Sequence, residues 1–140
     1  MRSTKHTIFL ALVLSSCTIE PVAINYGIDA CAFCSMTIVD GRHSAEYVTS
    51  KGKAFKFDAI ECMLGEMKRS DQQAALILVA DFSSPGKLIP VDEAIIVHCE
   101  AIPSPMGAFI SAFSDSSSLR KAIGENIFTL KDWNELKGSW

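Results

Sequence analysis

The chain has 140 residues, enough for one compact domain with its own core, and its 13 Lys and Arg against 16 Asp and Glu give a formal charge of -3. Hydrophobic residues make up 49% of the sequence and the mean hydropathy is +0.24, as in a packed globular protein. No basic run or patch is present, which argues against a nucleic-acid-binding protein.

The N-terminus has the pattern of a secretory signal peptide. Two basic residues precede the apolar run 7–14, which is too short to span a bilayer that needs about 20 apolar residues. The segment 14–17, Leu-Ser-Ser-Cys, is similar to a bacterial lipobox, in which the cysteine becomes diacylated and N-terminal. We therefore expect a lipoprotein signal peptide over residues 1–16, lipidation at Cys17 and a mature charge of -5, from 11 Lys and Arg against 16 Asp and Glu. The alternative is an ordinary signal sequence with an unmodified cysteine.

Residues 17–28 contain proline, asparagine and glycine and show no sustained hydrophobic period. We interpret them as the lipid anchor and a tether that joins the membrane to the folded domain. The domain itself is expected over residues 29–140.

The first half of this domain predicts a hairpin and a helix. Segments 44–49 and 53–57 are rich in β-branched and aromatic residues and flank a turn, which is typical of a hairpin. Apolar residues then recur from Ile60 at the spacing of one helical face, and Asp58 with Glu61 resembles a capping box.

The second half predicts mainly strands. The apolar run 74–80 has the length of a buried strand, and the loop 103–107 is rigid because it contains two prolines. Further strands are expected over 94–99, 108–113 and 127–130, with a short helix over 116–125 and a polar tail after it. The order indicates an α+β domain with two helices and a small mixed or mainly antiparallel sheet.

Two thiols and a thioether fall within six positions at the start of the domain, in the segment 31–36. Thiolate and thioether sulfur are the protein ligands best matched to copper(I), whereas zinc sites hardly ever use methionine. Cys34 and Met36 lie two residues apart, so in an extended segment both sulfurs leave on the same side and can bind one ion. The pair indicates a copper(I) site, against the alternative of a buried cysteine beside a core methionine.

Three separated motifs occur together in one known family. On these motifs the chain resembles the NosL family of nitrous oxide reductase accessory lipoproteins, with Ser35 where the family usually has glycine. The motifs are the Asp29/Cys31/Cys34/Met36 pattern after the lipobox-like segment, the helix start from Phe57-Asp58 to Cys62-Met63, and the loop Pro105-Met106-Gly107 with Ala112-Phe113 behind it.

The resemblance implies a NosL-like copper-binding domain over residues 29–140, with a fold similar to that of organomercurial lyase but without that enzyme's activity. It implies a copper(I) chaperone, not an enzyme, on the periplasmic side of the bacterial cell envelope. The implied partners are apo nitrous oxide reductase, its membrane copper-transporter complex and, through the lipid anchor, the membrane. The implied ligands are Cys34, Met36 and Met106, and no role carries over for Cys99.

Further candidate ligands are Cys31, Cys62, Met63 and His98. The helical stripe favours core packing for Met63, and a histidine in an alternating strand is more often partly buried than a ligand. His43 is expected in a solvated loop, and we find no Ser/His/Asp arrangement in the sequence that we interpret as catalytic.

The cysteines also leave other functions open. In an oxidising compartment Cys31, Cys34, Cys62 and Cys99 allow two disulfides with three possible pairings. The Cys-x-x-Cys motif permits an exported thiol-disulfide oxidoreductase that uses Cys31 and Cys34. Cys31, Cys34 and Cys62 with either His98 or Cys99 also match the ligand count of a zinc site that staples a structural envelope domain.

Overall fold

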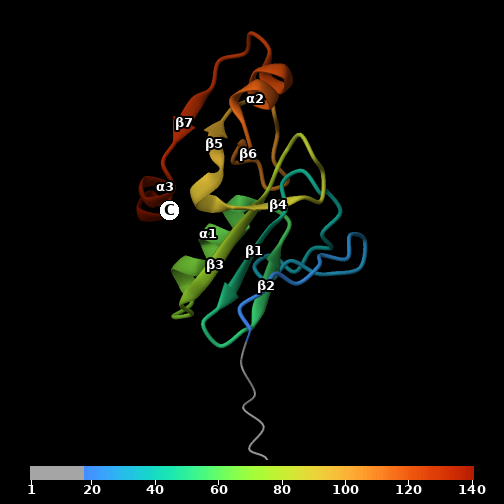
Figure 1. Ribbon diagram of the computed structural model, residues 1–140, viewed down its shortest axis with the longest axis vertical. Helices are drawn as coiled ribbons and strands as arrows, with labels where there is room; N and C mark the ends of the chain where they lie inside the picture. The colour runs from blue at the N-terminus through green and yellow to red at the C-terminus, as the bar shows by residue number, and fades with distance from the viewer. Residues whose placement is uncertain (1–17) are drawn as a thin grey trace, which may run out of the picture.

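The computed structural model describes residues 18–140, so the expected signal peptide and the lipidation site Cys17 lie outside the described residues. The described chain folds into two antiparallel sheets and three α-helices (Figure 1). This confirms the predicted α+β class. Within this range no helix is both long and apolar enough to cross a bilayer.

Two separate sheets stand where the sequence predicts one. The larger has the strand order β2-β1-β3-β4 and the smaller the order β6-β5-β7, and all of these neighbours pair antiparallel. A parallel bridge between Asp81 and Ala112 joins them. The strands are β1 (Ala45–Thr49), β2 (Ala54–Phe57), β3 (Ala74–Ala80), β4 (Leu88–Pro90), β5 (Ile95–His98), β6 (Ile110–Phe113) and β7 (Thr129–Lys131). The helices are α1 (Ile60–Arg69), α2 (Ser116–Ile123) and α3 (Trp133–Ser139), with a 3-10 turn η1 (Val91–Glu93).

The main core lies between the four-stranded sheet and α1. Every residue of β1 is buried, and Tyr47 stacks on Phe55 and Phe57 of β2, with ring centroids 4.9 and 5.5 Å apart. The predicted stripe of α1 supplies Met63 and Leu64 to the same core. Because α1 packs on β1 and β2, the start of the helix is held against the end of the hairpin.

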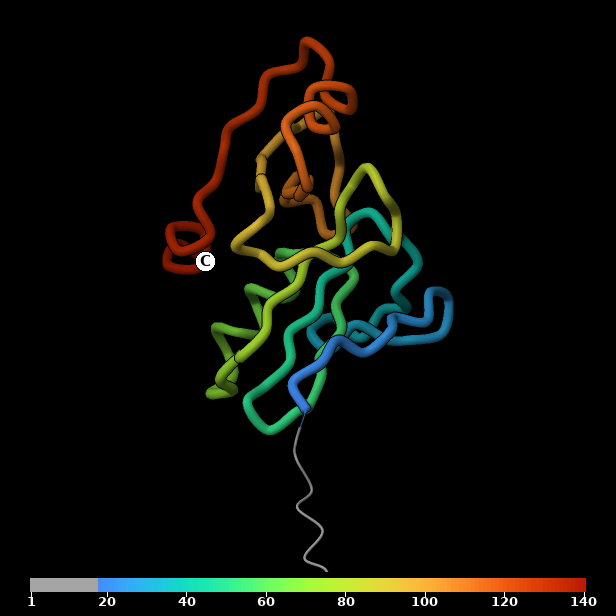
Figure 2. The backbone as a smooth tube through the Cα atoms, viewed as in Figure 1, coloured from blue at the N-terminus to red at the C-terminus, as the bar shows by residue number. Residues whose placement is uncertain are grey.

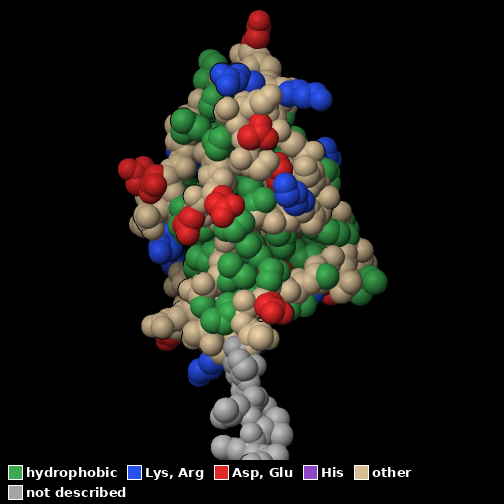
Figure 3. Space-filling model, viewed as in Figure 1, with side chains coloured by type: hydrophobic (Ala, Val, Ile, Leu, Met, Phe, Trp, Pro, Cys, Tyr) green, Lys and Arg blue, Asp and Glu red, His purple; other side chains and the backbone are tan. Residues whose placement is uncertain are grey.

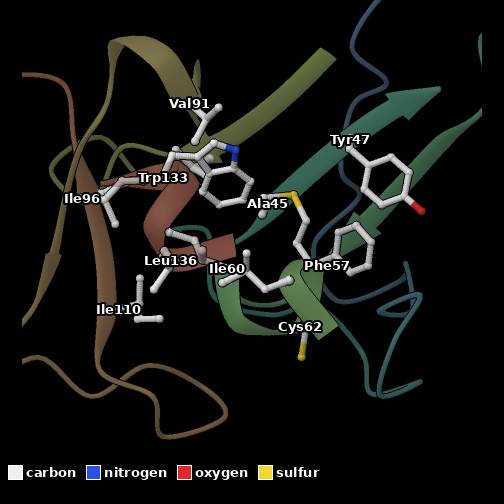
Figure 4. Close-up of a cluster of buried hydrophobic side chains, with 14 of the residues drawn as sticks. Ala45, Tyr47, Phe57, Ile60, Cys62, Val91, Ile96, Ile110, Trp133 and Leu136 are labelled. Atoms are coloured by element: carbon white, nitrogen blue, oxygen red, sulfur yellow. The ribbon is translucent and has the colours of Figure 1, made fainter. Parts of the chain in front are cut away.

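The C-terminal residues form a helix where a polar tail was predicted. Asp132 caps α3 by accepting hydrogen bonds from the backbone N–H groups of Asn134 and Glu135, at 2.9 and 3.0 Å. The helix packs Trp133 and Leu136 against the main core (Figure 4). Two buried residues in a single short helix are too few to produce a recognisable period, so the sequence pattern missed it.

A second core lies beneath α2 and the smaller sheet. Asp115 caps α2 through Ser117 and Ser118, at 2.9 and 2.8 Å. Gly124, with φ of 61°, ends the helix before the predicted residue 125. The buried residues of this core are Val97, Cys99, Ile102, Phe113, Leu119 and Ile123.

The segment predicted as a tether packs on the domain from residue 22 onward. The backbone N–H of Val22 donates to Glu46 Oε1 at 2.8 Å, and Tyr26 Oη shares a hydrogen bond with Ser44 at 2.8 Å. Figure 2 shows this segment, in blue, running across β1 and β2. A pocket of about 260 Å³ lies between residues 21–26 and β4. On the face seen in Figure 3, hydrophobic side chains gather over the middle of the molecule. Residues 22–28 are therefore part of the folded unit.

Candidate metal centre

The cysteine-containing segment forms a narrow loop. Ala30 and Thr37 form an isolated antiparallel bridge, and the Cys31 N–H donates to the Met36 carbonyl at 2.8 Å. At the end of the loop Ser35 has a φ of 64°, in the left-handed region. A residue other than glycine there costs about 1 to 2 kcal/mol. The predicted extended path from Cys34 to Met36 is therefore wrong, because the chain turns at Ser35.

The base of this loop is held by an ion pair. Lys56 Nζ lies 2.7 Å from Asp29 Oδ2, and the backbone N–H of Asn25 donates to the same oxygen at 2.8 Å. The hydrogen bond from Lys56, followed by that from Asn25, lowers the pKa of Asp29 below its ordinary value. The Asp29 side chain thus fixes the entrance of the loop to β2.

The far end of the loop is held against α1. Arg69 Nη2 donates to the Ala32 carbonyl at 3.1 Å, and its guanidinium carbon lies 4.9 Å from the centroid of the Phe33 ring. Gly65 lets this ring approach the helix, since a Cβ at that position would lie 2.6 Å from Phe33 Cζ. The loop therefore closes on the helix that carries Cys62.

Three thiols and one carboxylate meet where the loop touches the start of α1. The Sγ atoms of Cys31, Cys34 and Cys62 and a carboxylate oxygen of Asp58 all lie within 4.8 Å of one another. We call these four residues the thiol cluster. All but the half-buried Cys34 are buried. In Figure 4 the Cys62 side chain leaves α1 on the side away from Trp133 and Leu136.

Asp58 belongs to the thiol cluster and not to the helix cap. The structure places the N-cap at Ala59, without a side-chain cap bond, so the predicted capping box is wrong. The Cys34 thiol donates to the two Asp58 oxygens at 3.8 and 3.7 Å. Glu61, the other half of the predicted pair, instead accepts a hydrogen bond from Ser104 at 2.5 Å.

The hydrogen bonds among the thiols separate their acidities. The Cys62 thiol donates to Cys31, and this bond is the main reason why the pKa of Cys31 falls below its ordinary value of 9.0. The same bond, with burial and the nearby Asp58, raises the pKa of Cys62. Burial is also the main cause that raises the pKa of Cys34. Cys31 is thus the thiol that loses its proton first, and a thiolate is the form that binds metal.

The two methionines predicted as ligands lie at the surface. Met36 is 59% exposed beside the cluster in the cysteine loop, and Met106 is 47% exposed in the loop after β5. Met106 and Cys62 line the same pocket. Exposed thioethers offer soft donors that a docking partner can reach.

The other candidate ligands lie elsewhere in the fold. Met63 is fully buried in the main core, as its stripe predicts, and Cys99 is buried in the second core. His98, at the end of β5, packs edge-on against Phe109 with ring centroids 6.0 Å apart. Neither His98 nor Cys99 belongs to the thiol cluster. Among the described residues all four cysteines are free thiols.

His43 links Asp40 and Ser111 in a chain of hydrogen bonds. His43 Nδ1 lies 3.0 Å from Asp40 Oδ2, and His43 Nε2 lies 3.3 Å from Ser111 Oγ. His43 is buried rather than solvated. Ser111 is 0% exposed in the centre of β6, so no substrate reaches its hydroxyl. The chain of bonds joins the loop before β1 to the smaller sheet.

Comparisons with known proteins give a matching family model and a similar solved structure. The family model of NosL matches residues 21–135. Among solved structures the chain is similar to one described as the copper chaperone NosL from Shewanella denitrificans, with a TM-score of 0.72 and 20% sequence identity. That match covers 88% of this chain and 99% of the other, and at this identity it shows a shared fold. Comparison with curated proteins gives no match.

Proposed function

Because the chain belongs to the NosL family, as its three motifs predict, we propose that it is a copper(I) chaperone and not an enzyme. It stands on the periplasmic side of the bacterial cell envelope, anchored by lipid at Cys17. There it delivers copper for the maturation of nitrous oxide reductase, with the reductase and its membrane copper-transporter complex as partners. The similarity to a structure described as a copper chaperone supports copper as the cargo.

The observation that carries this proposal is the thiol cluster next to exposed methionines. A soft monovalent ion prefers thiolate and thioether sulfur. The fold gathers the sulfurs of Cys31, Cys34 and Cys62 at one place and leaves Met36 exposed two residues from Cys34. Cys34 is half-buried and so lies between the buried thiols and the surface.

In this proposal Cys34, Met36 and Met106 bind the ion and release it by ligand exchange. A donor of the receiving protein adds to the ion at the exposed side before a thioether leaves, so copper(I) is never free. Metal binding displaces thiol protons, and Asp58 accepts the hydrogen bond of the Cys34 thiol that must lose one. Cys31 and Cys62 lie close enough to supply further sulfur when no partner is docked.

A zinc centre is the second candidate, because the thiol cluster has the four donors of a closed tetrahedral site. Its composition differs from the predicted one, with Asp58 in the place expected for His98 or Cys99. A zinc staple would need neither Met36 nor Met106. The two candidates therefore differ in the role of the exposed thioethers.

Competition titration tests the proposal. The purified protein, kept reduced, should take up one copper(I) from a chromogenic copper(I) chelator. Met36→Ala and Met106→Ala should each weaken binding by about tenfold or more, equivalent to about 1.4 kcal/mol. Both side chains are exposed, so thermal unfolding should change little.

Val39→Ala is the matched control, since Val39 is also exposed and lies three residues after Met36 but has no atom that can bind the metal. If both methionine variants bind copper(I) as tightly as this control, the proposed ligand set is wrong. If the protein retains zinc in preference to copper(I) and unfolds when zinc is removed, the second candidate replaces the first.

A further inference from the structure

A pocket of about 260 Å³ is lined by Cys62, one residue of the thiol cluster, and by Met106. Cys62 contributes to its wall from α1, and Met106 contributes from the loop that follows β5. The pocket therefore spans from a buried thiol to an exposed thioether. The remaining lining residues are Phe33, Glu61, Gly107, Ala108 and Trp140.

Glu61 holds the Met106 loop at one side of this pocket. Its Oε1 accepts hydrogen bonds from Ser104 Oγ at 2.5 Å and from the Ala108 N–H at 3.5 Å. Ser104 Oγ in turn accepts from the Phe109 N–H at 2.9 Å. The loop that carries Met106 is thus tied at both ends to one carboxylate of α1, the residue before Cys62.

The other oxygen of Glu61 has no partner in the part of the chain that the structure describes. Glu61 is only 4% exposed, and its Oε2 is buried without a hydrogen bond. A buried carboxylate oxygen of this kind is costly unless a positive group visits it. Glu61 lines the pocket, so a cation that enters there can compensate it.

We propose that this pocket is the passage by which copper(I) moves between Met106 and the thiol cluster, and that Glu61 is its positioning residue. The inference rests on the proposed function. One Glu61 oxygen holds the loop that carries Met106, and the other attracts the cation inward. Carboxylate oxygen is a poor ligand for a soft ion, so Glu61 guides copper(I) without retaining it, and Cys62 is the first thiol met beyond Met106.

The test is the rate at which the purified, reduced protein takes up copper(I) supplied as its acetonitrile complex. Stopped-flow absorption of the copper–thiolate bond follows the uptake. Glu61→Gln keeps an oxygen for Ser104 but removes the charge, so the association rate should fall by about three- to tenfold and depend less on salt. Equilibrium affinity should fall less, because the ion rests on sulfur.

Two further variants sharpen the result. Glu125→Gln removes the same charge from an exposed position after α2 and should leave the rate unchanged. Ala108→Leu fills part of the pocket and leaves every proposed ligand in place, so it should also slow uptake, and it decides the matter if Glu61→Gln does not fold. Parent-like rates in both pocket variants refute the passage and leave the chaperone intact. A parent protein that takes up no copper(I) refutes both proposals.

Discussion

Replacing Gly65 by alanine tests the contact that closes the cysteine loop on α1. A methyl group there would lie 2.6 and 2.8 Å from two atoms of the Phe33 ring, closer than carbon atoms approach. Overpacking of this kind costs about 1 to 3 kcal/mol. We expect a cost at the low end of this range, since the Phe33 ring is half-buried and can turn outward when its contact with the Arg69 guanidinium is lost.

Alanine also favours the helix over glycine by about 1 kcal/mol, so the two effects oppose each other in the parent protein. Phe33→Ala removes the clash and leaves the helix preference. Gly65→Ala should therefore stabilise the Phe33→Ala protein by about 1 kcal/mol and be neutral or destabilising in the parent. The coupling energy between the two positions should be about 1 to 2 kcal/mol.

Urea unfolding of the four proteins in this cycle gives the coupling, and copper(I) affinity gives a second readout. A displaced Phe33 draws the 31–34 loop away from Cys62, so Gly65→Ala should weaken copper(I) binding in the parent. Equal stabilisation by Gly65→Ala in both backgrounds would refute the contact and the closure argued from it.

Two further predictions concern protons. Cys62→Ala removes the hydrogen bond that lowers the pKa of Cys31, so the thiolate absorbance step that precedes pH 9.0 in the parent should move upward; an unmoved step would exclude Cys62 as the cause. Because the pKa of Cys31 is lower in the folded protein than in the unfolded chain, its ionisation stabilises the fold. This stabilisation is fully present above pH 9.0 and is lost as the pH falls through the folded pKa. Burial raises the pKa of Glu46 above 4.5, so the folded protein holds this proton more tightly and loses stability as pH rises from 4.5 through the folded pKa. Glu46→Gln should lack this loss, and its free energy of unfolding relative to the parent should therefore increase across that interval; a constant difference contradicts the assignment.

The sequence predicts the elements whose pattern is long enough to be periodic. The stripe of α1 and the apolar run of β3 have four and seven informative positions, and both elements form. β4 and α3 are short, and the burial of their hydrophobic residues depends on packing against parts of the chain that are distant in sequence. The division into two sheets likewise depends on contacts between segments far apart in the chain, which no local period contains.

For the site, donor chemistry could be predicted but its arrangement could not. Cys31, Cys34 and Cys62 are candidates from sequence because soft donors are few in a chain of this size. Local spacing predicts a helix cap for Asp58, yet its carboxylate accepts a hydrogen bond from Cys34, 24 positions away. Asp58 stands in the motif from Phe57-Asp58 to Cys62-Met63, and this motif is a sequence signal that places it near Cys62. The sequence likewise predicts a solvated His43, whereas the side chain is buried against Ser111, 68 positions away.

The position of copper in the loaded protein tests the central claim most directly. Crystals of the reduced protein grown with one equivalent of copper(I) would locate the ion by anomalous scattering at the copper absorption edge. The proposal predicts a single peak in bonding contact with the sulfurs of Cys34, Met36 and Met106. A peak bound by Cys31, Cys62 and Asp58 with both methionines turned away, or no peak at all, would contradict it.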